Sequence, residues 1–419
     1  MKKNSSDSMT ITERKIITIT CLGHFLSHFN MLFFPALVLP LANYYGTDLS
    51  DIVGRSFWMY CFFGITALPW GIAADRWGAR RLMMIFHIGA GMCCFSAALW
   101  MDNLLIMSIC LAGLGAFSGI YHPTGLGWIS RSVSRISFGM AINGIFGNLG
   151  LAVSPLVAGI LNWMYGIKAV FWFAGAINLM GVFVLVGLPV PSEIQGKVSR
   201  NYSGKNMIKP FIMLLLAMML GGVVYRGATV ILPAYFELKN QGIFDFFIRL
   251  SDQLSPNVIA TMTVTSVFIA GMIGQYTGGR VAEHFDLRKC YLIFHVITIP
   301  MVITMACVSN VMLVVATMLY FFFLLGMQPI ENTLVAKLSP PQFIHSAYGT
   351  KFILTFGVGA FSVKMVAAIE RHTGMSSIFL TLAGISCLLV LSILGLIAVT
   401  QGIFQTLGKQ KQTEHNTSD

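Results

Sequence analysis

The polar stretch at residues 71–81 reads Gly71-Ile-Ala-Ala-Asp75-Arg76-Trp77-Gly78-Ala-Arg80-Arg81. A second stretch aligns with it without gaps and reads Gly279-Arg-Val-Ala-Glu283-His284-Phe-Asp286-Leu-Arg288-Lys289. Each lies between two long apolar runs, and each keeps an acidic residue followed by a basic pair. In the same way, His122-Pro123 and Arg131 correspond to Gln328-Pro329 and Lys337. The sequence therefore predicts an internal repeat of two similar halves.

The composition is that of a membrane protein. The chain has 419 residues, of which 56% are apolar and 10% are charged, and its mean hydropathy is +0.76. Soluble domains carry about 25% charged residues, so this chain lacks the polar surface that a soluble protein needs. No polar region between the apolar runs is long enough for a large soluble catalytic domain.

The apolar runs predict an all-α membrane protein with twelve transmembrane helices in two pseudo-symmetric six-helix bundles. A bilayer core of about 30 Å needs roughly 20 apolar residues per helix, and runs of about this length occur twelve times. We expect the helices at 16–42, 56–74, 82–101, 104–130, 137–162, 169–188, 211–235, 257–277, 290–309, 311–336, 345–369 and 376–403.

The basic residues predict the orientation of these helices. Of the 27 basic residues, 19 fall on one set of connections, five on the other and three within the expected helices. Cytoplasmic loops are enriched in Lys and Arg, so we expect both termini in the cytoplasm. The formal net charge of +11 is then explained by membrane topology, and nucleic acid is not expected as a partner.

The longest polar connection divides the chain into parts. We expect an N-terminal bundle at 1–188, a cytoplasmic linker at 189–210, a C-terminal bundle at 211–403 and a cytoplasmic tail at 404–419. Repeated halves with a site near the bilayer midplane are typical of secondary transporters.

The stretch at 71–81, in a loop between the second and third of twelve expected helices, resembles the signature loop of the major facilitator superfamily. The resemblance implies the major facilitator fold and a gate that closes the cytoplasmic side. We expect Asp75 to face the positive end of a neighbouring helix, and Arg76, Arg80 and Arg81 to pair with acids or lipid phosphates. The expected gate residues are Gly71, Asp75, Arg76, Gly78, Arg80, Arg81 and Arg131.

The fifth expected helix contains Gly147-Asn-Leu-Gly150-Leu-Ala-Val-Ser154-Pro155-Leu-Val-Ala-Gly159. This stretch resembles the Gly-rich, Pro-containing motif of antiporters in the superfamily, although Ser154 stands where Gly often precedes the proline. Small residues at such spacings also pack helices closely in any membrane protein. Both interpretations, an antiporter motif and simple helix packing, therefore stay open.

Three further stretches resemble the fosmidomycin-resistance type of exporter in this superfamily: Gly23-His24-Phe-Leu-Ser27-His28, Gly119-Ile-Tyr121-His122-Pro123-Thr-Gly125, and Arg226 followed by Leu232-Pro233. The resemblance implies proton-driven export of a small anionic or amphiphilic compound. The alternatives are a proton-coupled symporter that imports an organic anion, and a receptor or scaffold without transport activity.

Ionisable residues inside the membrane are costly and usually functional. The superfamily resemblance implies that the first, fourth, seventh and tenth helices line a central cavity. Five ionisable residues lie on these helices: His24, His28, His122, Arg226 and Glu331. The expected substrate-binding residues are His24, His28, Asn30, Tyr121, His122, Arg226 and Lys364. His87 and His295 lie on helices that are peripheral in the resembled fold, so we expect structural roles for them.

Two residues carry the expected charge chemistry. Arg226 has a fixed charge and a forked set of donors suited to a carboxylate or phosphonate, so we assign it to an anionic group of the substrate. Glu331 is the one carboxylate away from loops and helix ends, and it is the first candidate for proton coupling, with His122 as the second. An ion pair of Glu331 with Lys351 or Arg131 is the structural alternative.

The remaining expectations concern partners and location. No ATP-binding, metalloprotease or serine-hydrolase motif occurs, so we expect neither an enzyme nor a cofactor, and transport driven by the proton gradient. The eight cysteines lack metal-ligand or disulfide spacing, and no metal site is expected. We expect a monomer in the bacterial cytoplasmic (inner) membrane that contacts lipid, protons and a small-molecule substrate.

Overall fold

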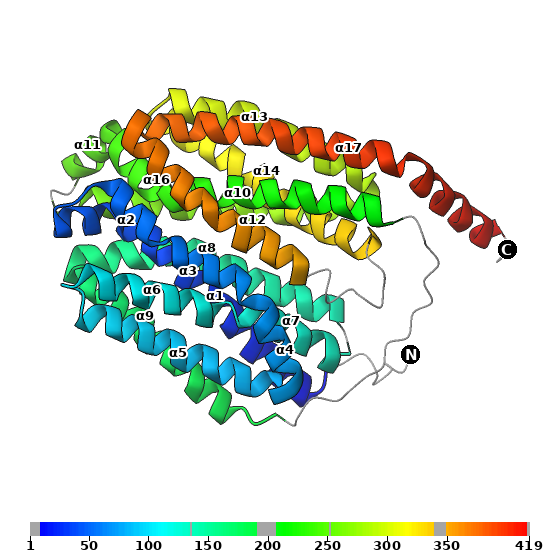
Figure 1. The fold of residues 1–419 in the computed structure, drawn as a ribbon, viewed down its shortest axis with the longest axis horizontal. Coiled ribbons are helices and arrows are strands. Elements are labelled where there is room, and N and C mark those ends of the chain that lie inside the picture. The colour runs from blue at the N-terminus through cyan, green and yellow to red at the C-terminus, as the bar shows by residue number, and fades with distance from the viewer. Residues whose placement is uncertain (1–8, 135, 191–206, 251–252, 339–348, 417–419) are drawn as a thin grey trace.

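The chain forms one elongated bundle of nearly parallel and antiparallel helices (Figure 1). The computed structural model describes residues 9–134, 136–190, 207–250, 253–338 and 349–416. The start of α1 and the end of α17 lie at the same end of the bundle, on the right in Figure 1. We call this the terminal end, and the opposite end, where α2 and α11 lie, the distal end.

The first half of the chain contains α1 to α9. Helix α1 begins directly after Thr10, whose side chain accepts a hydrogen bond from the Glu13 N–H in a capping box. The helices of this half are α1 (Ile11–Tyr45), α2 (Leu49–Arg55), α3 (Phe57–Ile65), α4 (Ala67–Trp77), α5 (Ala79–Leu99), α6 (Leu104–Ser118), α7 (Tyr121–Ser132), α8 (Ile136–Tyr165) and α9 (Ile167–Gly187).

Two expected helices of this half are interrupted, each close to a proline. The second, expected at 56–74, is divided into α3 and α4 with a bend of 44° before α4, and the short helix α2 precedes it. Pro69 has no N–H to bond to the carbonyl of Ile65, where α3 ends. The fourth is divided into α6 and α7, because Pro123 cannot bond to the carbonyl of Gly119. The second break places His122 in the first turn of α7.

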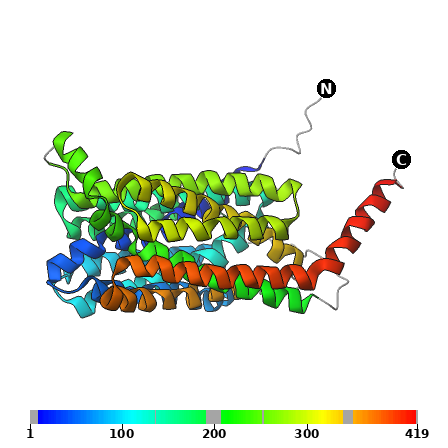
Figure 2. The ribbon, with the colours of Figure 1, turned by 90° about the horizontal axis from the view of Figure 1, so that it is seen from above.

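The second half contains the remaining elements. They are α10 (Ile208–Lys239), α11 (Gln241–Leu250), α12 (Pro256–His284), α13 (Leu287–Cys307), α14 (Asn310–Leu338), the π-helical turn η3 (Ile353–Gly357), the 3₁₀ turn η4 (Val358–Ala360), α16 (Phe361–Thr373) and α17 (Met375–Asn416). The eleventh expected helix is therefore irregular in its middle, and the twelfth continues beyond 403. Figure 2 shows the end of α17 projecting from the bundle.

The twelve expected spans have counterparts in the described part of the chain. Eleven helices are long and apolar enough to cross a membrane, and the bent pair formed by α2–α3 and α4 brings the number to twelve. Large apolar side chains such as Met92, Phe183 and Leu391 are exposed on the outside of the bundle, as expected for lipid contact. The predicted fold class is confirmed. Most of the expected linker, part of the expected tail, and Lys2, Lys3 and Arg135 lie outside the described residues.

The two halves repeat a structural contact as well as a sequence pattern. Arg80 donates to the carbonyl of Leu185, at 2.6 Å, in the last turns of α9. The aligned Arg288 donates to the carbonyl of Thr400 in α17, at 3.0 Å. Each arginine thus binds a backbone carbonyl group of the sixth helix of its own half. For Arg80 this carbonyl lies near the end of α9, which attracts positive charge. The contact explains why the basic residue persists in the degraded second copy.

Asp286 caps α13 at the terminal end. Its side chain accepts from the Arg288 backbone N–H at 2.9 Å and from the Arg288 guanidinium at 2.6 Å. These hydrogen bonds lower the pKa of Asp286, with the side-chain bond as the largest cause and burial as an opposing one.

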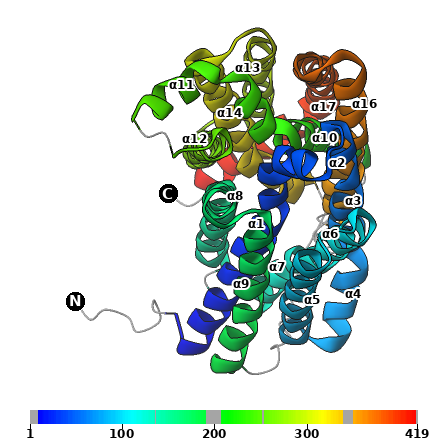
Figure 3. The same cartoon turned by 90° about the vertical axis from the view of Figure 1, so that its left-hand side faces the viewer.

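The halves contact each other from the distal end inwards (Figure 3). At the distal end, Arg371 of α16 pairs with Asp51 of α2 and donates to the Ser50 hydroxyl at 3.2 Å. Deeper in the bundle, α3 crosses η3 so closely that a Cβ on Gly64 would lie 2.1 Å from the Gly357 nitrogen. Glycine is therefore required there, and the two halves are in direct contact at this crossing.

Candidate functional site

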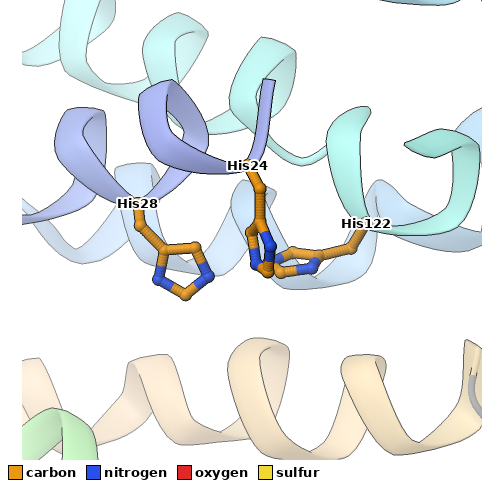
Figure 4. A group of neighbouring side chains, drawn as sticks. All are labelled: His24, His28 and His122. Carbon is orange, nitrogen blue, oxygen red and sulfur yellow. The ribbon is translucent and has the colours of Figure 1, made fainter. Parts of the chain in front are cut away.

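Three histidines meet in the interior of the bundle, two from α1 and one from α7 (Figure 4). The His24 and His28 ring centroids are 4.8 Å apart, and each lies 5.3 Å from the His122 centroid. One ring nitrogen from each residue lies within 4.8 Å of the others. We call this group the histidine triad. Side chains separated by four residues share a helix face, which explains the α1 pair.

The first half supports the triad from behind. His24 contacts the Asn143 carbonyl of α8 through Nδ1, at 2.9 Å. Tyr121 stacks on His24 with centroids 4.8 Å apart and donates to the Asn143 side chain at 2.8 Å. A Cβ on Gly147 would lie 2.5 Å from the His24 ring, so only glycine leaves room for the imidazole. Tyr121 is fully buried and supports His24, and its role in substrate binding stays a prediction.

The second half covers the triad with aromatic rings. His122 stacks on Phe352 with centroids 5.0 Å apart and lies 5.6 Å from Phe356. Phe63 of α3 contacts both His122 and Phe356. The triad thus lies at the boundary between the halves, where a rearrangement of either half changes its surroundings.

Arg226 enters the same region from α10. Its guanidinium carbon lies 3.7 Å from the centroid of the Tyr60 ring, a cation–π contact, and 5.8 Å from that of Tyr225. The side chain is buried, it is within electrostatic range of His28, and its Nη1 has no hydrogen-bond partner in the described part of the chain. A buried donor without a partner is costly, so this nitrogen is available to an anion.

Glu331 and Lys351 form a buried ion pair in the second half. The Lys351 Nζ lies 2.8 Å from Glu331 Oε1, and both side chains are at most 8% exposed. The Tyr291 hydroxyl donates to the other carboxylate oxygen at 3.0 Å, and Lys351 also donates to Asn332. Lys351 is within electrostatic range of His122. This geometry matches the structural alternative for Glu331, an ion pair with Lys351. Among the described residues, no ion pair joins Arg226 to Glu331.

Two expected binding residues lie away from this group. Asn30 is fully buried and exchanges hydrogen bonds with Asn178 at 2.9 and 3.1 Å. It lies two residues, or about 200°, beyond His28 on the helix and so faces the opposite way. Lys364 is exposed near the distal end, where its Nζ lies 5.4 Å from the Phe57 ring centroid. The structure therefore does not bring these two residues together with the others.

The stretch at 71–81 forms the turn between α4 and α5 at the terminal end. Asp75 pairs with Arg131 of the last turn of α7. Gly78 has a φ of 84°, which favours glycine. Gly71 packs against Pro123, because a Cβ added at Gly71 would lie 3.2 Å from the Pro123 Cβ. Arg76 and Arg81 are exposed, and Arg80 binds carbonyl groups where we expected an acid or a phosphate.

The glycine-rich stretch of α8 packs against α1 and α12. A Cβ on Gly150 would lie 2.3 Å from the Phe25 carbonyl oxygen, and one on Gly159 would lie 1.8 Å from Thr261 Oγ1 in the other half. The Ser154 hydroxyl donates to the Phe29 carbonyl at 2.7 Å, just before Pro155. These contacts fit the packing interpretation of the stretch.

Sequence reasoning missed several residues of the site: Tyr60, Phe63, Asn143, Phe352 and Phe356. The Phe352–Phe356 pair, four residues apart on a helix next to Lys351, offered a sequence signal. Tyr60 and Asn143 offered none, because their importance depends on contacts across the bundle.

Comparison with known proteins identifies the family. The family model described as Major Facilitator Superfamily matches residues 20–363. The multidrug resistance protein MdtG of Proteus mirabilis (strain HI4320) is 25% identical over 297 residues, which cover 66% of this chain and 70% of that protein. MdtG of Yersinia enterocolitica is 26% identical over 190 residues, 43% of this chain and less than half (45%) of its own length.

Solved structures show the same fold at low sequence identity. A POT family transporter in complex with 5-aminolevulinic acid superposes with a TM-score of 0.72 at 13% identity, covering 90% of this chain and 95% of that one. A mutant of the nucleoside transporter NupG superposes with a TM-score of 0.69 at 17% identity, covering 92% and 99%. The family indicates a secondary transporter, not an enzyme. With its family match across most of its spans, this multi-pass membrane protein belongs to the major facilitator superfamily.

Proposed function

We propose that this transporter is a proton-coupled antiporter that exports a small organic compound with an anionic group by alternating access. The anionic cargo is inferred from Arg226, a buried side chain whose Nη1 has no hydrogen-bond partner among the described residues and which is within electrostatic range of His28. Its guanidinium is held by the Tyr60 ring, so little conformational entropy is lost when an anion binds.

Export is supported by the relatives, which are named multidrug resistance proteins. We assign the proton to Glu331, a buried carboxylate that contacts Lys351 and Tyr291. Uptake of a proton by Glu331 removes one partner of the ion pair, which frees Lys351 and loosens the link between α14 and the segment before η3. His122 is better suited to the cargo, because it lies among the triad and the aromatic rings.

We further propose an orientation, a cellular location and an oligomeric state for the transporter. The closed distal side faces outward, so that both termini are cytoplasmic and the described state is closed to the outside. The distal contacts of Arg371 with Asp51 and Ser50 open when the cargo is released. The bacterial relatives support the inner membrane as the location, and one chain carries the whole site, which supports a monomer. The fosmidomycin-resistance exporters remain the proposed subgroup.

The Glu331–Lys351 pair favours a second candidate, the symporter that imports an organic anion. When Glu331 is protonated, Lys351 becomes available to an anion, so cargo and proton bind together and not in exchange. The direction in which a pH gradient moves the cargo distinguishes the two functions.

The test begins with an efflux screen of a deletion strain against wild type for drug, phosphonate and metallophore sensitivity. The compound that it identifies is then assayed with Arg226→Gln, and with Arg280→Gln as the control, because Arg280 is exposed and pairs with Glu283. A hydrogen bond to a charged group contributes about 1.5–3 kcal/mol. We expect KM to rise about 10- to 100-fold for Arg226→Gln only. An equal KM for both variants would contradict the anion assignment.

A further inference from the structure

The histidine triad has the arrangement of a metal-binding site. Three imidazole groups from α1 and α7 place one ring nitrogen each within 4.8 Å of the others, and Figure 4 shows the rings side by side. In a tetrahedral zinc site with metal–nitrogen distances of about 2.0–2.1 Å, ligand nitrogens are about 3.4 Å apart. Side-chain rotations that move each ring by about 1 Å would close the difference.

The free nitrogens point to a ligand. Both ring nitrogens of His122 are buried and have no hydrogen-bond partner among the residues that the structure describes, and the residue is only 6% exposed. A buried imidazole that leaves its nitrogens unpaired is costly. His87 shares this feature, and His122 differs from it because two further imidazole groups lie close to its ring nitrogens. A ligand that accepts electron pairs from nitrogen satisfies His122.

His24 has the second contact that metal-binding histidines usually have. Its Nδ1 lies 2.9 Å from the Asn143 carbonyl oxygen. A carbonyl accepts a hydrogen bond, so Nδ1 carries the proton and Nε2 keeps its lone pair for a metal. Tyr121 and Gly147 hold the ring in this orientation from either side.

The surrounding charges indicate whether the metal ion binds alone or as a complex with a chelator. Arg226 is within electrostatic range of His28, and Lys351, which Glu331 neutralises, is within range of His122. The positive charge of Arg226 opposes a bare divalent cation. It attracts a complex in which carboxylate groups of a small chelator surround the metal.

We propose that His24, His28 and His122 coordinate a divalent transition-metal ion, of the class that imidazole prefers (Zn²⁺, Co²⁺, Ni²⁺, Cu²⁺), within a cargo complex whose carboxylate contacts Arg226. Three protein ligands leave a coordination position open for the chelator. Treating the metal as cargo rests on the proposed function, whereas the metal site itself does not.

The experiment uses the purified full chain in detergent, with Co²⁺ as the probe, either alone or as its citrate complex. Visible absorption reports on coordination to nitrogen. We expect a saturable spectral change that Zn²⁺ abolishes, with the citrate complex binding at least tenfold more tightly than Co²⁺ alone. His24→Gln, His28→Gln and His122→Gln should each weaken binding at least tenfold, and His372→Gln, at an exposed site on α16, should not.

Arg226→Gln should weaken binding of the citrate complex and tighten that of Co²⁺ alone, because it removes a positive charge near the site. A wild-type protein without any Zn²⁺-sensitive change overturns the metal site, and this result does not depend on a variant that folds. Equal affinity for both probes overturns the chelate. The binding measurement needs no gradient, so its failure and a failure of proton-driven export are observed separately.

Discussion

The buried Glu331–Lys351 pair gives the most quantitative prediction. Glu331→Gln preserves the shape of the side chain but leaves the Lys351 ammonium buried without an opposing charge, since the two side chains are only 5% and 8% exposed. Removing one partner of a buried pair costs about 3–5 kcal/mol. We therefore expect Glu331→Gln to lower the free energy of unfolding by about that amount, a factor of roughly 10² to 10⁴ in the folding equilibrium.

The assay is unfolding of the purified protein in mixed micelles, monitored for wild type, Glu331→Gln, Lys351→Met and the double variant. Because the double variant removes both charges, its loss should be several kcal/mol smaller than the sum of the single losses. Glu283→Gln is the matched control, since Glu283 is exposed and lies 4.0 Å from Arg280; it should change stability by less than about 1 kcal/mol. Additive losses in the double variant would refute the buried pair.

Three further predictions concern separate parts of the molecule. Gly147→Ala should displace the imidazole that it faces and abolish cargo transport, whereas Gly144→Ala, where nothing lies within 4 Å of an added Cβ, should keep it; transport by both variants would contradict the packing of the site. Cys307 is exposed at the distal end, so an impermeant maleimide should label it from outside intact inner membranes, and labelling only from the cytoplasmic side would reverse the topology. Because its pKa is lowered, Asp286 should stabilise the fold fully above pH about 4 and lose this effect as the pH falls through the lowered pKa. Unfolding curves of Asp286→Asn, measured over this pH range, should lack the acid-dependent loss of stability. Curves of the variant that run parallel to those of wild type would disprove the stabilising role of Asp286.

Much of the fold was accessible from the sequence, because apolar runs of about 20 residues dictate the spans. The breaks near Pro69 and Pro123 were not predicted, because prolines such as Pro155 and Pro233 lie inside continuous helices of the same chain, so a proline alone does not mark a break. The π-helical turn at Ile353–Gly357 carries no comparable signal. It depends on the close crossing with Gly64, which sequence alone does not reveal.

The candidate site was accessible only in part. His24, His28 and His122 stood out because ionisable residues are rare in membranes, and the structure brings them together. The position of Asn30 could have been predicted from helix geometry, since a separation of two residues reverses the face. The exposed position of Lys364 near the distal end could not have been predicted, because it depends on how α16 packs against α2 and α3.

The central claim is that cargo leaves in exchange for protons carried by Glu331. The direct measurement uses everted membrane vesicles that are acidic inside, with a pH-sensing dye, and adds the cargo identified by the screen. We predict that cargo collapses the pH gradient in wild type and Glu283→Gln, and leaves it intact in Glu331→Gln. A gradient that collapses equally in Glu331→Gln, or that no variant collapses, would contradict the account.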